Sequence, residues 1–293
     1  MRLDGKVAIV TGGGRGLGRA YANALAAAGA SVVVNDVDGD AARATAAAIG
    51  GVAEVCAVGE TPAADALVAR AVAEFGRLDV MVTNAGVLRD KVLWKMTDED
   101  FDLVVRTHLR GTFTCARAAA IQMRAQGEGG RIVVVGSPAG QFGNFGQTNY
   151  AAAKAGVVAF ARTWAIELAR AQITVNAIVP TAWTQMTATI PIYEPLVERD
   201  EFPPEVRREH ALGMPEECAP LVVFLASEAG GGVTGQAIGI GGDRLSLYSH
   251  PAEIVHELRD GGWTAEAIAA AWSETFAASA QPFGVHLPAL ELS

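Results

Sequence analysis

The chain has 293 residues, of which 51% are hydrophobic and 19% are charged. This length fits one large domain or two small ones, and the hydrophobic share can supply a substantial core. The formal net charge of −9 argues against broad binding to nucleic acids or anionic membranes. Charged residues interrupt the first ten positions, and no apolar run is long enough to span a bilayer.

Three cysteines, Cys56, Cys115 and Cys218, lie far apart and lack the spacing of metal ligands. Buried free thiols are therefore expected, in a reducing compartment that we take to be the cytoplasm. The histidines also form no ligand cluster in the sequence, so no metal is expected.

Short apolar runs alternate with Ala-rich runs through most of the chain, which predicts an α/β fold with a parallel sheet. The first run, Lys6 to Val10, suits a buried strand, and the Gly-rich segment from Thr11 to Gly18 connects it to an Ala-rich helix. Glycines at this position let the backbone turn sharply and approach a pyrophosphate held at the helix N-terminus. The candidate cofactor-binding residues in this segment are Gly12, Arg15, Gly16, Leu17 and Gly18.

A second strand, from Val32, ends at Asp36. A carboxylate in this place can accept hydrogen bonds from the adenosine ribose and repel a 2′-phosphate, which favours NAD(H). Arg15 could instead pair with the extra phosphate of NADP. We give the carboxylate precedence, so Arg15 would be a solvated side chain or a neighbour of the pyrophosphate.

Further elements are predicted in order along the chain. Helices are expected at about 41–49, 63–75, 98–125, 149–169 and 215–227, and strands at 52–58, 78–82, 132–136, 173–179 and 236–240. Asn84, Ala85 and Gly86 follow the fourth strand, at the sheet edge where ligands bind in open α/β folds. These three residues are therefore candidates for contact with the cofactor, although such a tripeptide alone would be an ordinary turn.

Tyr150 and Lys154 lie four residues apart in Ala-rich sequence, so they should share one helix face. A phenol normally has a pKa of about 10, and an ammonium one turn away favours the phenolate. Ser137 ends the apolar strand before this helix and could hold a substrate oxygen. Exposed Tyr and Lys residues are common, so this pair gains weight only from the Gly-rich segment.

Together, the segment 11–18, Asn84-Ala85-Gly86, Ser137 and the run 150–154 resemble the short-chain dehydrogenase/reductase family over roughly residues 3–243. The resemblance implies a Rossmann-type, doubly wound parallel sheet and interconversion of a secondary alcohol and a ketone with NAD. It assigns Ser137, Tyr150 and Lys154 to catalysis, with Tyr150, Lys154, Pro180 and Trp183 also near the cofactor. It further implies a homodimer or homotetramer with contacts on the helices at 98–125 and 149–169.

A closer likeness lies in Leu88-Arg89-Asp90-Lys91, Thr97 to Asp100, His108 to Phe113 and Gly143 to Gln147. These stretches resemble the (3R)-hydroxyacyl-CoA dehydrogenase domain of peroxisomal multifunctional enzyme type 2 and bacterial relatives associated with steroid and acyl-CoA degradation. The implied substrate is a 3-hydroxyacyl-CoA, with a hydroxysteroid or another secondary alcohol as the alternative. Two alternatives come from other functional classes, namely a non-catalytic NAD-binding sensor or scaffold and a partner-binding module. The presence of all three candidate catalytic residues disfavours the sensor or scaffold.

Three positions depart from the family pattern. Gly59-Glu60-Thr61 stands where an Asp commonly contacts adenine, and Thr181 replaces a Gly after Pro180. His108 occupies the place of an Asn that helps to maintain a water path to the lysine. A histidine here could relay protons or bind a backbone group, and a purely structural role is the alternative.

The segment 183–212 contains four prolines and no sustained periodicity, which predicts a loop or short-helix lid over the substrate within a domain spanning 1–243. A merely irregular connection is the alternative. An apolar pocket is expected from Phe142, Phe145, Trp183 and Met186, and Arg199, Arg207 and Arg208 could meet the phosphates of CoA.

Residues 244–293 are predicted to form a helical C-terminal extension, with helices at Pro251–Arg259 and at Thr264–Ser279. Thr264 is a plausible N-cap, and Ile268, Trp272 and Phe276 form an apolar stripe at four-residue steps. This stripe packs either against its own subunit or, in a sharper hypothesis, against another subunit or its substrate pocket.

Overall fold

The computed structural model describes residues 1–184, 187–189, 193, 196, 202–285 and 288. Within these ranges the chain forms one eight-stranded sheet in the order β3-β2-β1-β4-β5-β6-β7-β8. The strands are β1 (Val7–Thr11), β2 (Ser31–Asp36), β3 (Val52–Val55), β4 (Val80–Thr83), β5 (Gly130–Val135), β6 (Ile173–Pro180), β7 (Ala237–Gly241) and β8 (Arg244–Leu247). The first seven are parallel, and β8 pairs antiparallel with β7. The strand order reverses between β1 and β4, which confirms the predicted Rossmann-type sheet.

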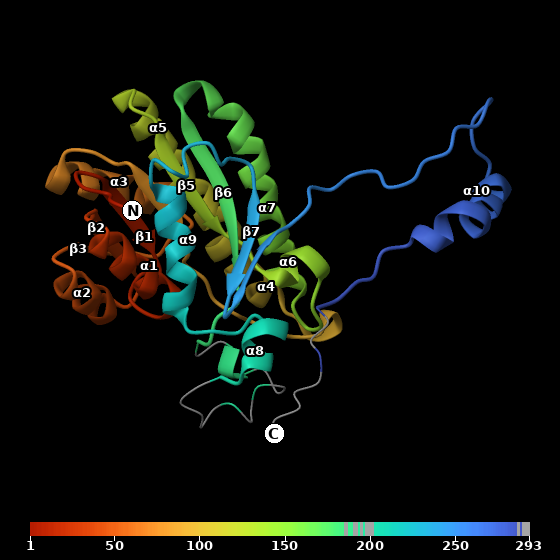
Figure 1. Cartoon of the computed structure of the whole chain (residues 1–293), viewed down its shortest axis with the longest axis horizontal. Helices are drawn as coiled ribbons and strands as arrows, with labels where there is room; N and C mark the ends of the chain where they lie inside the picture. The colour runs from red at the N-terminus through yellow and green to blue at the C-terminus, as the bar shows by residue number, and fades with distance from the viewer. Residues whose placement is uncertain (185–186, 190–192, 194–195, 197–201, 286–287, 289–293) are drawn as a thin grey trace.

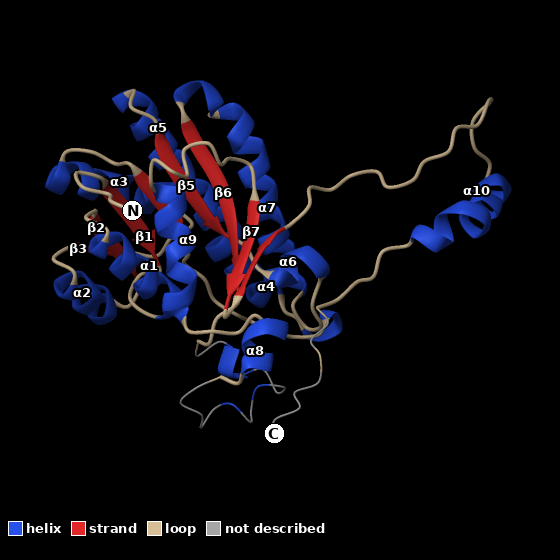
Figure 2. Cartoon of the chain, viewed as in Figure 1, coloured by secondary structure: helices blue, strands red, loops and turns tan. Residues whose placement is uncertain are grey.

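Helices cover both faces of this sheet (Figure 2). One face packs against α1 (Gly16–Ala27), α2 (Gly39–Ala48) and α9 (Pro215–Ala226). The other face packs against α3 (Thr61–Phe75), α5 (Gly111–Gln126) and α7 (Thr148–Glu167). Because successive residues of a strand point to opposite faces, Val10 joins the first core and Ile9 the second. This burial on both faces explains why the strands read as continuous apolar runs.

The predicted helix at 98–125 forms, but with an interruption. It consists of α4 (Asp98–Val105), a π-helical turn at Arg106–Arg110 and α5. Thr97 caps its start through a capping box with Asp100. The π turn inserts one residue into the helical repeat, and such insertions occur frequently at functional sites. The short helix α6 (Pro138–Phe142) was not predicted, whereas the short helix α8 (Pro204–Glu209) lies within the predicted loop or short-helix lid.

The C-terminal region differs most from the sequence prediction. The prediction of a helix at Pro251–Arg259 was wrong, since these residues form no helix or strand. A short helix needs a packing surface, and this segment leaves the body of the molecule (Figure 1). The second helix is present in shortened form as α10 (Ala265–Ala271), and Thr264 caps it by accepting from the Ala267 amide. Strand β8 was not predicted.

Part of the predicted lid can be compared with the structure. Its described residues form a 3-10 turn at Thr187–Thr189 and helix α8. The predicted contributions of Met186 and Arg199 lie outside the described residues. No helix in the described ranges combines the length and the apolar character that crossing a membrane requires.

Candidate active site

A cavity of about 1460 Å³ lies at the C-terminal edge of the parallel strands. It gathers residues that are distant in the sequence but follow neighbouring strands, as the strand order predicts. The predicted residues that line it are Gly12, Arg15, Gly16, Leu17, Gly18, Asp36, Asn84, Ala85, Gly86, Ser137, Tyr150, Lys154 and Pro180. Trp183 was also predicted here but does not line the cavity. Its ring packs instead against Tyr193 and Phe202, because a small separate apolar cluster offers it burial.

The Gly-rich turn is held in a shape that only glycine can supply. Gly12 has φ +63° and Gly16 has φ +52°, both in the left-handed region. A Cβ on Gly18 would lie 2.0 Å from the Gly12 carbonyl oxygen. Asn84 Nδ2 donates to the carbonyl oxygens of Thr11 and Gly12, at 3.1 Å each. The turn therefore leaves the backbone amides at the N-terminus of α1 facing the cavity. This Gly-rich cradle fits a dinucleotide pyrophosphate.

Asp36 stands at the end of β2 with both carboxylate oxygens in use. Oδ2 accepts from the Gly14 amide and Oδ1 from the Asp38 amide, at 3.0 Å each. Arg15 does not turn to Asp36, because it forms an ion pair with Asp38. Among the described residues, no cation pairs with Asp36, so its negative charge stays available to ribose hydroxyls and repels a phosphate.

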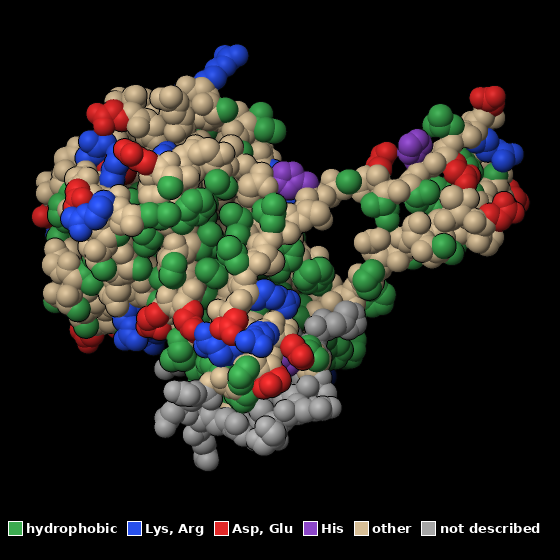
Figure 3. Space-filling model, in the orientation of Figure 1, with side chains coloured by type: hydrophobic (Ala, Val, Ile, Leu, Met, Phe, Trp, Pro, Cys, Tyr) green, Lys and Arg blue, Asp and Glu red, His purple; other side chains and the backbone are tan. Residues whose placement is uncertain are grey.

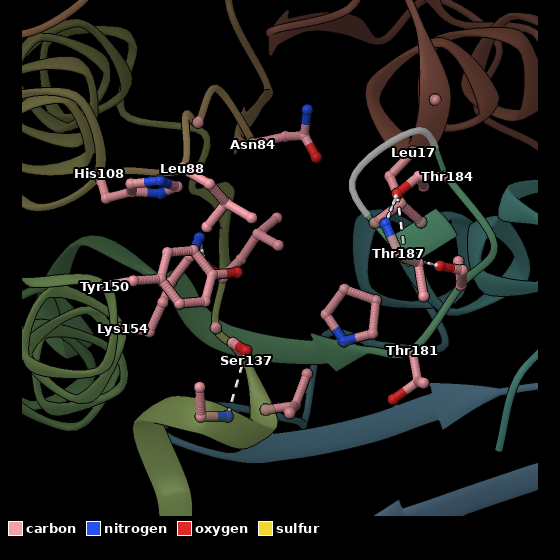
Figure 4. Close-up of a pocket in the computed structure, with 18 of the residues that line it drawn as sticks. Leu17, Asn84, Leu88, His108, Ser137, Tyr150, Lys154, Thr181, Thr184 and Thr187 are labelled. Atoms are coloured by element: carbon pink, nitrogen blue, oxygen red, sulfur yellow. Dashed lines mark hydrogen bonds between the residues drawn. The ribbon is translucent and has the colours of Figure 1, made fainter. Parts of the chain in front are cut away.

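Tyr150 and Lys154 project from α7 into the cavity, facing Ser137 (Figure 4). Ser137 is the N-cap of α6, and its Oγ accepts from the Ala139 amide at 3.2 Å. Lys154 Nζ lies 5.6 Å from the centre of the Tyr150 ring and donates to the Val135 carbonyl at 2.6 Å. One hydroxyl, one phenol and one amine thus meet in a buried place, which suits proton transfer to or from a substrate oxygen.

Burial changes the electrostatics that the sequence predicted for this pair. It raises the pKa of Tyr150, and the Ser137 hydroxyl only partly offsets this effect. Burial also lowers the pKa of Lys154 to about 7, so the amine is only partly charged near neutral pH. The expectation that Lys154 lowers the Tyr150 pKa is therefore not met in the described structure. Both groups have lost water, and each disfavours its own charged form.

His108 lies behind Tyr150, a contact that the sequence did not predict. The π turn buries the imidazole to 2% exposure, and its ring meets the Tyr150 ring edge to face with centroids 5.0 Å apart. Nε2 lies 2.8 Å from the Val87 carbonyl oxygen, while Nδ1 is buried without a partner among the described residues. A Cβ on Gly86 would lie 2.2 Å from the ring, so this glycine makes room for the imidazole.

The imidazole of His108 is neutral at physiological pH. Burial and, secondarily, the nearby Lys154 lower its pKa to about 3. A neutral ring can pack tightly against Tyr150 without adding a charge beside the phenol. This contact limits where the Tyr150 ring can move.

The substrate side of the cavity includes residues that the sequence analysis missed. Phe142 lines it as predicted, whereas Phe145 is 84% exposed and does not line it. The unpredicted lining residues near this end are Arg244, Ser246, Tyr248, Pro282, Gly284 and Val285. The Phe142 and Tyr248 rings lie 6.0 Å apart, and the Gly284 amide donates to the Phe142 carbonyl at 2.6 Å. No local sequence pattern predicts this wall of the cavity, because it forms only where residues 282–285 fold back against Phe142.

The arginines proposed for CoA phosphates also need correction. Arg207 is bound to Glu217 and Asp243, and Arg208 lies 3.7 Å from Asp243. Neither lines the cavity, since the nearby carboxylates hold them at the outer side of α8. Arg89 and Arg244 line the cavity instead.

Comparisons with known proteins identify the relatives of this chain. Residues 12–242 match the family model described as Enoyl-(Acyl carrier protein) reductase. "Hydroxyacyl-CoA dehydrogenase ChsB1" of Mycobacterium tuberculosis is 41% identical over 266 residues, which cover 85% of this chain and 81% of that protein. "3-oxoacyl-[acyl-carrier-protein] reductase FabG" of Thermotoga maritima is 39% identical over 255 residues, covering 83% and 98%.

Other relatives are longer than this chain. "Peroxisomal multifunctional enzyme type 2" of Mus musculus is 42% identical over 240 residues, which are 78% of this chain and only 31% of the mouse protein. Among solved structures, a short chain dehydrogenase from Mycobacterium avium matches with a TM-score of 0.83 and 33% identity, covering 97% of this chain and 98% of that one. The chain belongs to the short-chain dehydrogenase/reductase family of oxidoreductases.

Proposed function

We propose that this protein interconverts a secondary alcohol and a ketone with NAD(H), and that its substrate is a 3-hydroxyacyl-CoA. The observation that carries the proposal is the convergence of Ser137, Tyr150 and Lys154 in the cavity that also contains the Gly-rich cradle. A non-catalytic NAD-binding sensor would need only the Gly-rich cradle that holds the cofactor, and it would not need these three residues together. The three free cysteines support residence in a reducing compartment such as the cytoplasm.

Each of the three residues has a separate task in alcohol oxidation. Ser137 holds the substrate oxygen by a hydrogen bond beside the phenol. Tyr150 takes the hydroxyl proton as the carbinol carbon loses its hydride, and in ketone reduction it returns the proton. Lys154 holds ribose hydroxyls and, when protonated, adds positive charge that favours the phenolate. When bound, the nicotinamide supplies the hydride chemistry.

Because burial raises the pKa of Tyr150, the phenolate needs a positive charge nearby. His108 adds none, since it stays neutral. Protonated Lys154 is the cation in reach, and its pKa of about 7 makes its charge sensitive to what binds beside it.

The choice of NAD over NADP is supported by Asp36, whose carboxylate faces the cavity without a cationic partner among the described residues. Arg15, the natural candidate for binding a 2′-phosphate, is engaged by Asp38. Since Asp38 already neutralises the Arg15 guanidinium, Arg15 does not offset the carboxylate of Asp36.

The acyl-CoA substrate is supported by the walls of the substrate end. Phe142, Tyr248 and Val285 offer apolar contact, and Arg89 and Arg244 offer positive charge in the same cavity. A thioester with an apolar acyl chain and a phosphorylated carrier matches both features. A hydroxysteroid would use only the apolar walls.

The test is initial-rate NADH formation across 3-hydroxyacyl-CoA thioesters, hydroxysteroids and simple secondary alcohols. We expect selective turnover of the thioesters, with the corresponding free 3-hydroxy acids as matched controls that lack the CoA part. Equal rates with thioester and free acid would contradict recognition of CoA. Selective turnover of steroids would replace the proposed substrate.

A further inference from the structure

Large apolar side chains are usually buried, and polar side chains such as Asn are usually exposed. Two parts of this chain depart from that rule. Ile268 and Trp272 are 54% and 56% exposed on the C-terminal extension (Figure 3), so packing of their stripe against its own subunit is not observed among the described residues. Asn149, in the first turn of α7, is instead completely buried. Burying an amide is unfavourable unless its polar atoms are paired, so the partners of Asn149 indicate what it does.

Every polar atom of the Asn149 side chain has a partner. Its Nδ2 donates to the Arg89 carbonyl at 3.2 Å and to the Asp100 carbonyl at 3.1 Å. Its Oδ1 accepts from the Tyr150 amide at 2.8 Å. The opposite orientation of the amide would set an oxygen against two carbonyl oxygens, so only this orientation satisfies all three bonds. One side chain thus joins the loop after β4, the first turn of α4 and the backbone of Tyr150.

The bond to the Tyr150 amide takes the place of a helix cap. This amide belongs to the first turn of α7, where a helix leaves its backbone donors without partners inside the helix. Gln147 occupies the N-cap position, but its side chain caps no amide of this turn. Asn149 supplies the missing acceptor, and it does so at the residue that carries the phenol.

Several stretches that carry the closer family likeness meet around this buried amide, namely 88–91, 97–100 and 143–147. The Lys91 amide donates to the Gly146 carbonyl at 2.8 Å, and Lys91 Nζ lies 2.6 Å from an Asp100 carboxylate oxygen. Gln147 Nε2 donates to Asp90 at 2.8 Å. These bonds hold the 88–91 loop independently of the amide, and Leu88, Arg89 and Asp90 of this loop line the cavity.

We propose that Asn149 is a positioning residue for the reaction, because it fixes Tyr150 at a set distance from the 88–91 wall of the cavity. Asn149 itself does not line the cavity, so it acts through Tyr150. The inference rests on the proposed function, since the exact place of the phenol matters only if Tyr150 moves a proton. A misplacement of about 1 Å can cost a catalytic group about 100-fold in rate.

The test is Asn149→Ala in the full chain, with Asn176→Ala as the matched control. Asn176 is 1% exposed and also pairs with the backbone through both ends of its amide, since Nδ2 donates to Val233 and Oδ1 accepts from Gln236. It lies outside the cavity. Both variants should melt at a lower temperature than the unmodified protein, because both leave buried backbone groups unpaired.

Only Asn149→Ala should lose catalysis, with kcat for the thioester falling about 30-fold. The KM should stay within about threefold, because Lys91 and Gln147 still hold the 88–91 loop. The dissociation constant of NADH should stay within about threefold as well, since Asn149 makes no side-chain bond to the Gly-rich cradle. Asn149→Ser restores an acceptor beside the Tyr150 amide and should recover part of the lost kcat.

An unchanged kcat in a destabilised Asn149→Ala would show that the residue serves stability alone and would refute the positioning role. An equal fall in Asn176→Ala would refute it too, because general loosening would then explain the loss. If Asn149→Ala does not fold, as judged by NADH binding, Asn149→Ser carries the test: kcat should fall about fivefold, and the original kcat would refute the role. Absence of turnover in the unmodified protein would refute the proposed function and this inference with it.

Discussion

The two ends of the cavity are built in different ways. The cofactor end consists of turns that directly follow β1, β2 and β4, and backbone groups tie them together, as when Asn84 bonds the carbonyls of Thr11 and Gly12. The substrate end joins α6, β8 and residues 282–285, which come from distant parts of the sequence. A rigid backbone cradle suits a constant cofactor. The substrate wall depends on contacts between segments far apart in the sequence, such as the bond from the Gly284 amide to the Phe142 carbonyl.

Tyr150 lies where the two ends meet, so its loss should have the largest effect. Tyr150→Phe removes the proton carrier and should lower kcat by about 100- to 10,000-fold. The ring remains, so NADH binding should stay within about twofold. Steady-state kinetics and NADH fluorescence titration measure the two quantities. Turnover at the original rate would refute the assigned role.

Gly18→Ala tests the rigidity of the cofactor end. The new Cβ would lie 2.0 Å from the Gly12 carbonyl oxygen, so the turn must shift. We expect NADH affinity to fall at least about tenfold, since the backbone amides that face the pyrophosphate move with the turn. Gly232→Ala is the control, because nothing lies within 4 Å of its Cβ. An unchanged dissociation constant for Gly18→Ala would show that the cradle is adaptable.

His108→Asn tests the buried contact behind Tyr150 through the pH dependence of stability. His108 has a pKa of about 3 when folded against 6.5 when exposed, so the unfolded chain binds its proton first as the pH falls. The free energy of unfolding should therefore fall below pH 6.5, by up to about 1.4 kcal/mol per pH unit. Asn does not titrate, so urea unfolding from pH 6.5 to 5 should show a loss about 1.6 kcal/mol smaller. Equal losses in both proteins would contradict a neutral buried His108.

Asp36→Ala separates cofactor choice from substrate recognition. Removing the carboxylate should lower the NAD-to-NADP ratio of kcat/KM about tenfold, because a 2′-phosphate is no longer repelled. The KM for the substrate should not change. Asp40→Ala is a suitable control, since Asp40 is close in sequence but exposed and outside the cavity. The same ratio in Asp36→Ala as in the unmodified protein would argue against this role.

Phe142→Ala complements Asp36→Ala, because it tests substrate recognition at the substrate end of the cavity and leaves the cofactor end intact. The ring is 47% exposed, so its loss removes only part of an apolar contact. The KM for the thioester should rise about fivefold, with the NAD-to-NADP ratio unchanged. Phe145→Ala, a change outside the cavity, should leave both quantities as they were. A change in cofactor ratio with Phe142→Ala would mean that the two ends are not independent.

The sequence by itself determined the sheet and the cofactor end. Strand and helix periodicity, the glycines from Gly12 to Gly18 and the four-residue step from Tyr150 to Lys154 are local patterns. Local backbone geometry fixes what they form, and parallel strands bring their C-terminal ends to one edge. The family resemblance added the order of these motifs.

Only the tertiary structure decided the substrate end. Trp183 packs against a neighbouring apolar cluster, and Arg207 forms an ion pair with Glu217. Residues 282–285 bind the backbone beside Phe142. The raised pKa of Tyr150 likewise depends on burial by segments far away in the chain. In each case, tertiary packing decides which of several possible residues a side chain contacts. The spacing of residues along the sequence does not specify which of them lies nearest in the folded protein.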